Sequence, residues 1–235
     1  MRPASGYKMA NFRTNRRKSS GIWDAGECAL LLIDYQAHSM AGIRSGDPKA
    51  VELNAGCLAK AAVAFGIPVV LSTIAVNLGL GRPTVLALRN EVPNAPEIDR
   101  TVLDAWGDQN FIKSVRKTGR KRLVMGGVHT ETSLTYTVVA ALKDDYEIGF
   151  VADASGGMTK EAHDLAVLRM IQAGAVPHTT IALITEWSRD WKSPVVAAAR
   201  KRLRPTLEPP PCPSIESSWR SSSRRPEVLM PWEHS

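Results

Sequence analysis

The chain has 235 residues, and 44% of them are hydrophobic, which is enough for one sizeable buried core. Its formal net charge of +7 comes from its ends, because residues 23–199 carry 17 basic and 19 acidic side chains. No apolar run reaches the ~18 residues that a membrane-spanning helix needs, so we expect no such helix. Few aromatic residues accompany the basic ones at the ends, so nucleic-acid binding is not favoured either.

We expect a globular domain over residues 23–199, flanked by a basic tail over 1–22 and a Pro- and Ser-rich tail over 200–235. Both tails have compositions that are typical of disordered segments. The first tail lacks the apolar stretch of a secretory signal and could be an expression remnant. The second could be a linker, a proline-rich ligand for a partner, or an out-of-frame translation.

Apolar runs without polar alternation are typical of strands that are buried on both faces of a parallel sheet. In chain order, they occupy residues 28–36, 67–75, 122–128, 146–157 and 175–180. Helical patterns alternate with these runs and occupy residues 47–66, 107–119, 132–145 and 159–174. Strands that alternate with helices predict an α/β fold with right-handed crossovers.

Four polar positions follow predicted strands or precede a predicted helix, and ligands of open α/β sheets bind beyond the carboxyl ends of the strands. Asp34 is either a turn carboxylate or a general base. Arg100 is a surface charge, a partner that holds Asp34 ionised, or a binder of a substrate carboxylate. Ser133 is an early helix residue or a nucleophile that needs a base within about 3 Å. Asn77 follows the run at 67–75.

The cysteines and histidines are scattered rather than grouped as metal ligands usually are. The cysteines have no paired spacing and predict reduced thiols in a cytoplasmic protein: Cys28, Cys57 and Cys212. Among the histidines, His129 stands out because it lies in the turn after the run at 122–128. No glycine-rich phosphate motif follows a predicted strand, so we expect neither a metal nor another cofactor.

Seven blocks between about residues 24 and 196 resemble the isochorismatase-like cysteine hydrolase superfamily, and its YcaC-related branch most. In order they read ALLLIDYQ, IPVVLST, PEIDRTVLDAW, RKRLVMGGVHTETSL, VADASGG, AHDLAVLRMIQAGA and TEWSRDW. The resemblance implies a doubly wound, three-layer α/β fold with a mostly parallel sheet of about six strands. It also implies hydrolysis of a small amide or related C–N bond, and homo-oligomer formation.

The resemblance assigns roles to individual residues of this chain. Asp34 matches the aspartate that closes the first strand, and Arg100 matches the basic residue before the AW motif. Ser133 occupies the position of the nucleophilic cysteine, which completes a catalytic triad in the family. The oxyanion hole is expected from the backbone N–H groups of Ser133 and His129. A non-proline cis peptide is expected between Val128 and His129.

The serine at the nucleophile position departs from the family pattern. A serine hydroxyl is far less acidic than a thiol, so thiolate chemistry does not carry over to Ser133. Three explanations stay open: an engineered Cys replacement, a natural member with lost or changed activity, or catalysis without a covalent nucleophile. In the last case Asp34 would protonate a vinyl ether, as in true isochorismatases, and His129 is a further proton-transfer candidate.

The expected ligand is a small molecule in a partly hydrophobic pocket. Asn77, Leu103 and Trp106 are expected to line this pocket. No match to the histidine-rich zinc motif of nicotinamidases is found around residues 75–82, so no metal is expected. A catalytically silent binding or assembly module is the competing interpretation, because the apolar and Trp side chains at 179–191 could form a subunit interface.

Overall fold

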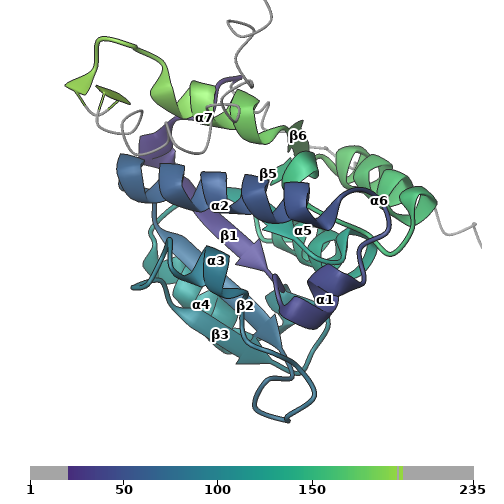
Figure 1. Cartoon of the computed structure of the whole chain (residues 1–235). Coiled ribbons are helices and arrows are strands. Elements are labelled where there is room, and N and C mark those ends of the chain that lie inside the picture. Colours follow the sequence, from purple (N-terminus) through teal and green to yellow (C-terminus); the bar gives the residue numbers. More distant parts are fainter. Residues whose placement is uncertain (1–20, 195, 198–235) are drawn as a thin grey trace, which may run out of the picture.

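Six strands form one fully parallel sheet in the order β3-β2-β1-β4-β5-β6 in the computed structural model (Figure 1). The structure describes residues 21–194 and 196–197. The strands are β1 (Cys28–Ile33), β2 (Val69–Ile74), β3 (Glu97–Arg100), β4 (Arg122–Gly127), β5 (Glu147–Val151) and β6 (Val176–His178). This arrangement confirms the predicted doubly wound, parallel α/β fold.

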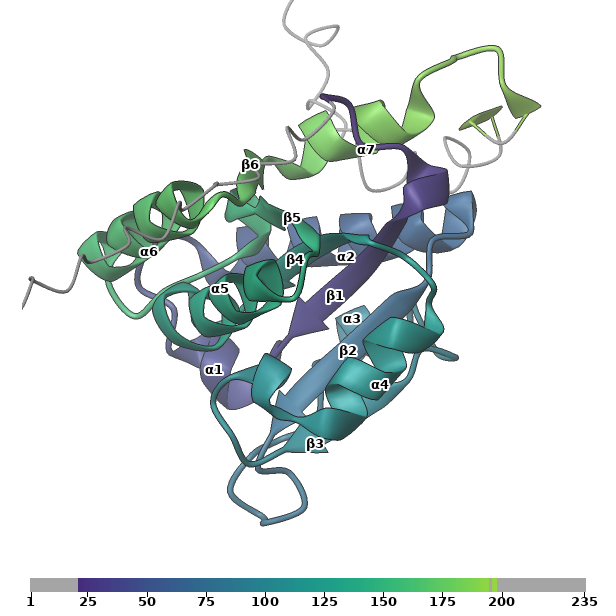
Figure 2. The ribbon, with the colours of Figure 1, turned by 180° about the vertical axis from the view of Figure 1, so that it is seen from behind.

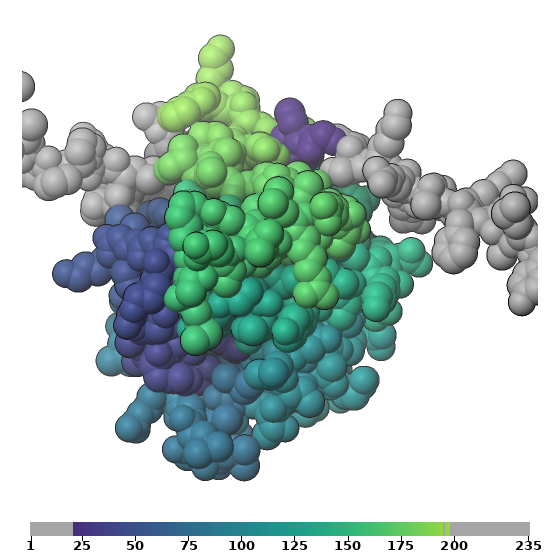
Figure 3. Space-filling view, turned by 90° about the vertical axis from the view of Figure 1, so that its right-hand side faces the viewer, coloured from purple at the N-terminus to yellow at the C-terminus, as the bar shows by residue number. Residues whose placement is uncertain are grey.

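Helices cover both faces of the sheet and make three layers, as Figures 1 and 2 show from opposite sides. The helices are α1 (Ala37–Ala41), α2 (Pro48–Phe65), α3 (Leu86–Arg89), α4 (Gln109–Lys117), α5 (Thr135–Lys143), α6 (Lys160–Ala173) and α7 (Thr180–Ser188). Residues of α2 and α7 share one hydrophobic core with the sheet, and residues of α4, α5 and α6 share the other. Figure 3 shows the face that α6 and α7 cover at the β6 edge.

The first strand explains why an unbroken apolar run was the right signal. All six residues of β1 are buried. Leu30 and Leu32 point into the core under α2 and α7, whereas Leu31 and Ile33 belong to the core under α4 and α5. Each fully buried side chain of this kind contributes about 1.5–3 kcal/mol to the free energy of unfolding. A strand between two helical layers therefore has no polar face to alternate with.

The longer helices begin and end at the residues that the sequence indicated. The Asp47 carboxylate accepts a hydrogen bond from the Lys49 N–H at the start of α2. Gly66, with a φ of 68°, ends the same helix in the left-handed region that glycine adopts without a steric penalty. Thr159 caps α6 through a hydrogen bond from the Ala162 N–H. Local capping therefore sets the lengths of the crossover connections.

Strand β3 was not predicted, and Arg100 was placed in an irregular segment. The strand has only four residues, and the first three are half-buried. A short, polar edge strand has neither an apolar run nor a clear alternation to reveal it. Arg100 is thus the last residue of an edge strand, which points it toward the carboxyl end of the sheet.

The predicted tails and Cys212 lie outside the described residues, apart from Gly21 and Ile22. Cys28 and Cys57 are buried free thiols. None of the helices among residues 21–194 and 196–197 is both long enough and apolar enough to cross a bilayer.

Candidate active site

The order of the strands places a topological switch point between β1 and β4. These two strands are neighbours, and Ile33 at the end of β1 pairs with Gly127 at the end of β4. The chain continues from β1 to one side of the sheet, toward β2, and from β4 to the other side, toward β5. Such a switch point is where ligands bind in open α/β sheets. Asp34 follows β1, and the segment from Val128 to Ser133 follows β4, so both lie at this switch point.

Asp34 is held in an unfavourable backbone conformation. Its φ is 59°, in the left-handed region, which costs a residue other than glycine about 1–2 kcal/mol. Its side chain is buried, and its N–H donates to the Ser72 carbonyl at 2.8 Å. Non-glycine residues in such conformations cluster at functional sites, where the surrounding structure holds them. This geometry favours a functional aspartate over a simple turn carboxylate.

Arg100 forms a two-pronged ion pair with Asp34. Its Nη1 lies 3.0 Å from Asp34 Oδ1, and its Nη2 lies 2.8 Å from Oδ2. The same two nitrogens also donate to the carbonyl oxygens of Thr73, at 3.1 Å, and Leu103, at 3.0 Å. Arg100 is itself buried, so these contacts fix the plane of the Asp34 carboxylate. They support the role of partner to Asp34 rather than binder of a substrate carboxylate.

The pKa of Asp34 is raised from its ordinary value. Burial raises it most, because it penalises the charged carboxylate, while the charge of Arg100 and hydrogen bonds from Arg100 and Ser133 act in the opposite direction. Because Ser133 acts on this pKa, the nucleophile candidate lies near the base candidate. A carboxylate with a raised pKa is better suited to exchange a proton near neutral pH.

Ser133 lies in a single π-helical turn, Thr130–Leu134, that leads into α5. Such turns are rare and occur often at functional sites. The Ser133 carbonyl accepts a hydrogen bond from the Thr137 hydroxyl at 2.7 Å, and that hydroxyl accepts one from the Ala105 N–H at 3.1 Å. Ser133 is 5% exposed, so its surroundings are nearly closed to solvent. The sequence predicted an ordinary helix from residue 132, whereas α5 begins at Thr135.

The peptide bond between Val128 and His129 is cis, as the resemblance predicted. The glycines before it are required by close packing. A Cβ at Gly127 would lie 3.1 Å from the Ile33 Cβ, and one at Gly126 would lie 2.5 Å from the Tyr35 hydroxyl. The His129 Nε2 is buried and has no hydrogen-bond partner among the described residues. Gly126 and Gly127, the last residues of β4, therefore let this strand pack closely against the end of β1 just before the cis peptide.

The three residues expected to line a substrate pocket lie in different surroundings. Asn77 is exposed, and its N–H donates to Asp99 at 2.8 Å. Leu103 is 58% exposed and touches the site through its carbonyl, which accepts from Arg100. Trp106 is buried, and its Nε1 donates to Asp144 at 2.9 Å. A substrate contact of these three residues stays a prediction.

Two further residues hold the loop after β2, and no motif in the sequence pointed to them. Gln36 is fully buried, and its amide group bonds both the N–H and the carbonyl of Ile74. Asp99 accepts hydrogen bonds from the N–H groups of Val76 and Asn77, at 3.0 and 2.8 Å. Partial burial raises the pKa of Asp99, but these hydrogen bonds outweigh it and hold the pKa below its usual range. Both residues therefore fix the backbone at the carboxyl end of β2.

His163 lies beside the π-helical turn. The Thr130 hydroxyl is 2.9 Å from His163 Nδ1, which links the π-helical turn to α6. Burial lowers the pKa of His163 and so favours its neutral form, although the nearby Asp164 and Glu131 act in the opposite direction. Among residues 21–194 and 196–197, no three His, Cys, Asp or Glu side chains are grouped as ligands for a metal ion.

Comparisons with family models, curated proteins and solved structures agree on the family of this chain. The model of the isochorismatase domain matches residues 28–182. The Escherichia coli protein described as "Probable hydrolase YcaC" is 31% identical over 177 residues, which are 75% of this chain and 85% of the relative. YcaC from Pseudomonas aeruginosa, solved with hexane-2,5-diol and covalent acrylamide, has a TM-score of 0.76 and is 30% identical. The match covers 80% of this chain and 93% of the solved chain.

The YcaC gene product of Escherichia coli has also been solved, as an octameric hydrolase of unknown specificity. Its TM-score is 0.76 and its identity 31%, with 81% of this chain and 93% of the other covered. Both matches cover nearly the whole length of the solved chains, so the likeness extends to the whole fold. The resemblance drawn from seven short blocks is thereby confirmed.

Proposed function

Because this chain belongs to the isochorismatase family and is related to YcaC, we propose that Asp34, Arg100 and Ser133 form its reacting site. The observation that carries this proposal is the buried, two-pronged ion pair between Arg100 and Asp34, with Ser133 close enough to act on the pKa of the same carboxyl. The proposed substrate is a small amide or related C–N compound. No cofactor takes part in this chemistry.

The proposed reaction proceeds through a covalent acyl-enzyme. Asp34 accepts the proton of residue 133 while the side-chain oxygen attacks the carbonyl carbon. The backbone N–H groups of His129 and Ser133 stabilise the negative charge on the carbonyl oxygen. Asp34 then donates the proton to the leaving nitrogen, and the C–N bond breaks. Water releases the acyl group by the same proton exchange in reverse, which restores Ser133.

The serine limits this reaction. Even with its pKa raised by burial, the Asp34 carboxylate is a weak base for a serine hydroxyl, which is far less acidic than a thiol. A thiol at the same position would ionise much more readily, since the ordinary thiol pKa is about 8.5. We therefore propose that the chain as it stands is a slow or inactive hydrolase whose machinery is otherwise complete.

The test compares the chain with its Ser133→Cys variant, using acrylamide and a panel of small amides. We expect the variant to gain the mass of one acrylamide and to release ammonia or amine faster than the parent, by at least a hundredfold. Ser133→Ala is the control, because it removes the nucleophile without adding a thiol. Mass spectrometry must place the adduct on residue 133, because the chain also contains Cys28, Cys57 and Cys212.

A second substitution shows whether Asp34 is the base. Asp34→Asn in the Ser133→Cys background should lower amide turnover by about 10² to 10⁴, the usual contribution of a general base. If Ser133→Cys neither turns over amides nor reacts with acrylamide while it is folded, the covalent mechanism is wrong. Ligand binding that survives Asp34→Asn without any turnover would instead indicate a silent binding module.

One observation favours a second candidate function. Because burial raises the pKa of Asp34, the carboxyl keeps its proton to higher pH, as acid catalysis on a vinyl ether requires. In that reaction Asp34 would act without a covalent nucleophile, and His129 could relay the proton. Turnover of a vinyl ether that is abolished by Asp34→Asn but survives Ser133→Ala would identify this mechanism.

We further propose a homo-oligomer in a reducing, cytoplasmic location. The oligomer rests on the octameric YcaC relative, and the location rests on the two buried free thiols. The proposed ligand is a small molecule, because the side chains around Asp34 and Ser133 are almost closed to solvent.

A further inference from the structure

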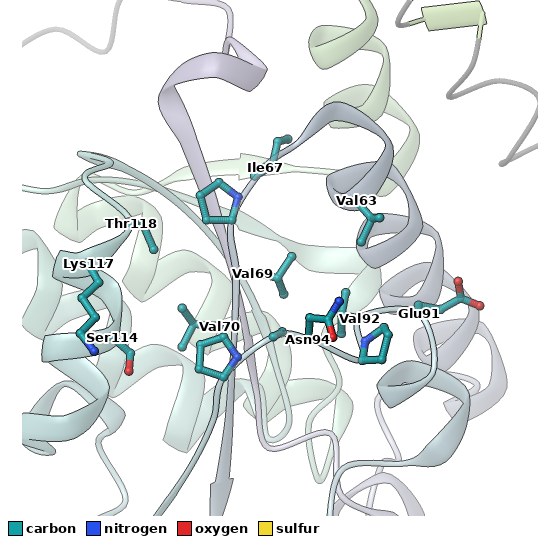
Figure 4. A pocket seen from close by; sticks show the side chains of 14 residues that line it. Val63, Ile67, Val69, Val70, Glu91, Val92, Asn94, Ser114, Lys117 and Thr118 are labelled. Atoms are coloured by element: carbon teal, nitrogen blue, oxygen red, sulfur yellow. The ribbon is translucent and has the colours of Figure 1, made fainter.

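A groove of about 760 Å³ lies at the amino end of the sheet, opposite the end that carries the candidate active site. Its walls come from the end of α2, from the loop between α3 and β3, and from α4 (Figure 4). Strand β2 begins in this groove at Val69 and ends at Ile74, beside the site. The strand's length, about 17 Å, separates the two places. We call this cavity the β2 groove.

The floor of the β2 groove is apolar. Ile67, Val69 and Val70 lie along its centre in Figure 4, and Val63 of α2 faces it from one wall. Val63 is 40% exposed although it is hydrophobic, so this wall has no covering side chain. Its volume falls in the range of about 300–1,000 Å³ that is usual for small-molecule sites. An apolar chain would gain about 25 cal/mol for each Å² that it buries there.

The charges around the groove are not balanced. Glu91 on the α2 side forms an ion pair with Lys60 at 3.3 Å, so its charge is compensated. Ser114 and Lys117 lie three residues apart on α4, which puts both on the same face of the helix. Figure 4 shows them together on the opposite wall. Within the described part of the chain, neither side chain has a hydrogen-bond or ion-pair partner.

The Lys117 ammonium group and the Ser114 hydroxyl group both donate hydrogen bonds. Side by side, they suit an anion with two acceptor oxygens. The apolar floor between this wall and α2 suits a hydrocarbon chain. We propose that the β2 groove binds a small amphiphile, with its carboxylate at Ser114 and Lys117 and its unbranched apolar tail over Val69 and Val70. This inference does not depend on the proposed hydrolase function.

The probe is decanoate, kept below its micelle concentration and titrated into the full chain by calorimetry. Lys117→Met removes the charge but keeps the length of the side chain, and should weaken binding about three- to tenfold. Val63→Glu places a negative charge on the apolar wall and should abolish binding. Lys143→Met is the matched control, because Lys143 is an exposed lysine on α5, outside the groove, and the affinity of this variant for decanoate should be unchanged.

Decyltrimethylammonium, which has the same tail and the opposite charge, should not bind. The proposal is overturned if decanoate fails to bind at millimolar concentration, or binds Val63→Glu and Lys117→Met as well as the parent. It is also overturned if Asp34→Asn abolishes binding, since decanoate would then occupy the candidate active site. A fall in the oligomeric mass of Val63→Glu would show that the groove is a subunit interface instead.

Discussion

At the scale of single residues, Asp34 combines a left-handed backbone with a buried charge, and neither feature favours the folded state by itself. Its contacts compensate for both. The two nitrogens of Arg100 match the two carboxylate oxygens, and the backbone of Ser72 holds the main chain. The unfavourable backbone conformation and the buried charge of Asp34 are therefore stabilised only by neighbouring groups, which is typical of functional residues.

Removing Arg100 should destabilise the protein strongly. Arg100→Met leaves the Asp34 carboxylate buried without a partner, and we expect the free energy of unfolding to fall by about 3–5 kcal/mol. Urea denaturation measures this change. Asp34→Asn combined with Arg100→Met should recover part of the loss, because the unpaired charge is gone. Arg116→Met, at an exposed arginine, is the control and should cost less than about 1 kcal/mol.

Equal stabilities for Arg100→Met and Arg116→Met would contradict a buried charge pair. They would mean that Arg100 contributes no more than a surface arginine, and that something else orients Asp34.

The pKa of Asp34 provides a separate prediction. Because its pKa is raised in the folded protein, Asp34 should still titrate above the ordinary aspartate value of about 3.9. The sign for stability follows: protonated Asp34 favours folding below that value, and the contribution is lost as pH rises through the folded pKa. Carbon NMR of labelled aspartate carboxyls, with Asp34→Asn to assign the signal, measures it. A midpoint below 3.9 would mean that Arg100 outweighs burial.

At the scale of elements, the loop after β2 depends on one carboxylate from the neighbouring edge strand. Asp99 holds the backbone N–H groups of Val76 and Asn77 and also accepts from the Thr73 hydroxyl at 3.0 Å. These bonds tie the loop to β3, whose last residue is Arg100. The loop after β2 and the arginine that pairs with Asp34 are therefore positioned by the same short strand.

Asp99→Ala should loosen this loop. We expect amide exchange at Val76 and Asn77 to quicken at least tenfold, and the free energy of unfolding to fall by about 1–3 kcal/mol. Hydrogen-exchange mass spectrometry and urea denaturation test both. Asp164→Ala, which removes only an exposed ion pair on α6, should change stability by less than about 1 kcal/mol. Unchanged exchange at Val76 and Asn77 would show that Gln36 alone holds the loop.

The pH dependence of the loop has a defined sign. The pKa of Asp99 is lowered in the fold, so its contribution to stability is present above about pH 3.9 and is lost as pH falls through the folded pKa. The loop should therefore open under acid conditions before the sheet does.

At the scale of the whole molecule, the carboxyl and amino ends of the sheet have different properties. The carboxyl end carries the ion pair, the cis peptide and the π-helical turn, while the β2 groove lies at the amino end. Several large hydrophobic side chains are exposed, among them Leu165 and Leu168 of α6. Exposed apolar faces of this kind are common where subunits meet.

We expect the full chain to form a homo-oligomer. Light scattering after size exclusion should give a mass that is a multiple of the chain mass of 25.6 kDa. Leu165→Lys combined with Leu168→Lys serves as a surface test, because charges on an apolar face oppose its burial. A monomeric mass for the parent chain would contradict the prediction. An unchanged mass for the double variant would place the interface elsewhere.

Much of the fold and the candidate site was available from local sequence. Runs such as 28–36 had no polar face, which indicated strands between two helical layers, and the caps at Asp47, Gly66 and Thr159 marked the helix ends. These signals are local, because they depend on residues a few positions apart. The family motifs added Asp34, Arg100 and Ser133 as residues that share one site.

Only the tertiary structure decided how those residues meet. Strand β3, the two-pronged pairing of Arg100 with Asp34, and the support from Gln36 and Asp99 all join segments far apart in the chain. The β2 groove likewise combines two helices and two loops. Local preferences cannot specify such contacts, because they arise from the strand order that the packing of both helical layers imposes. The sequence by itself determined the layers and the chemical groups, and the strand order decided which of these groups touch.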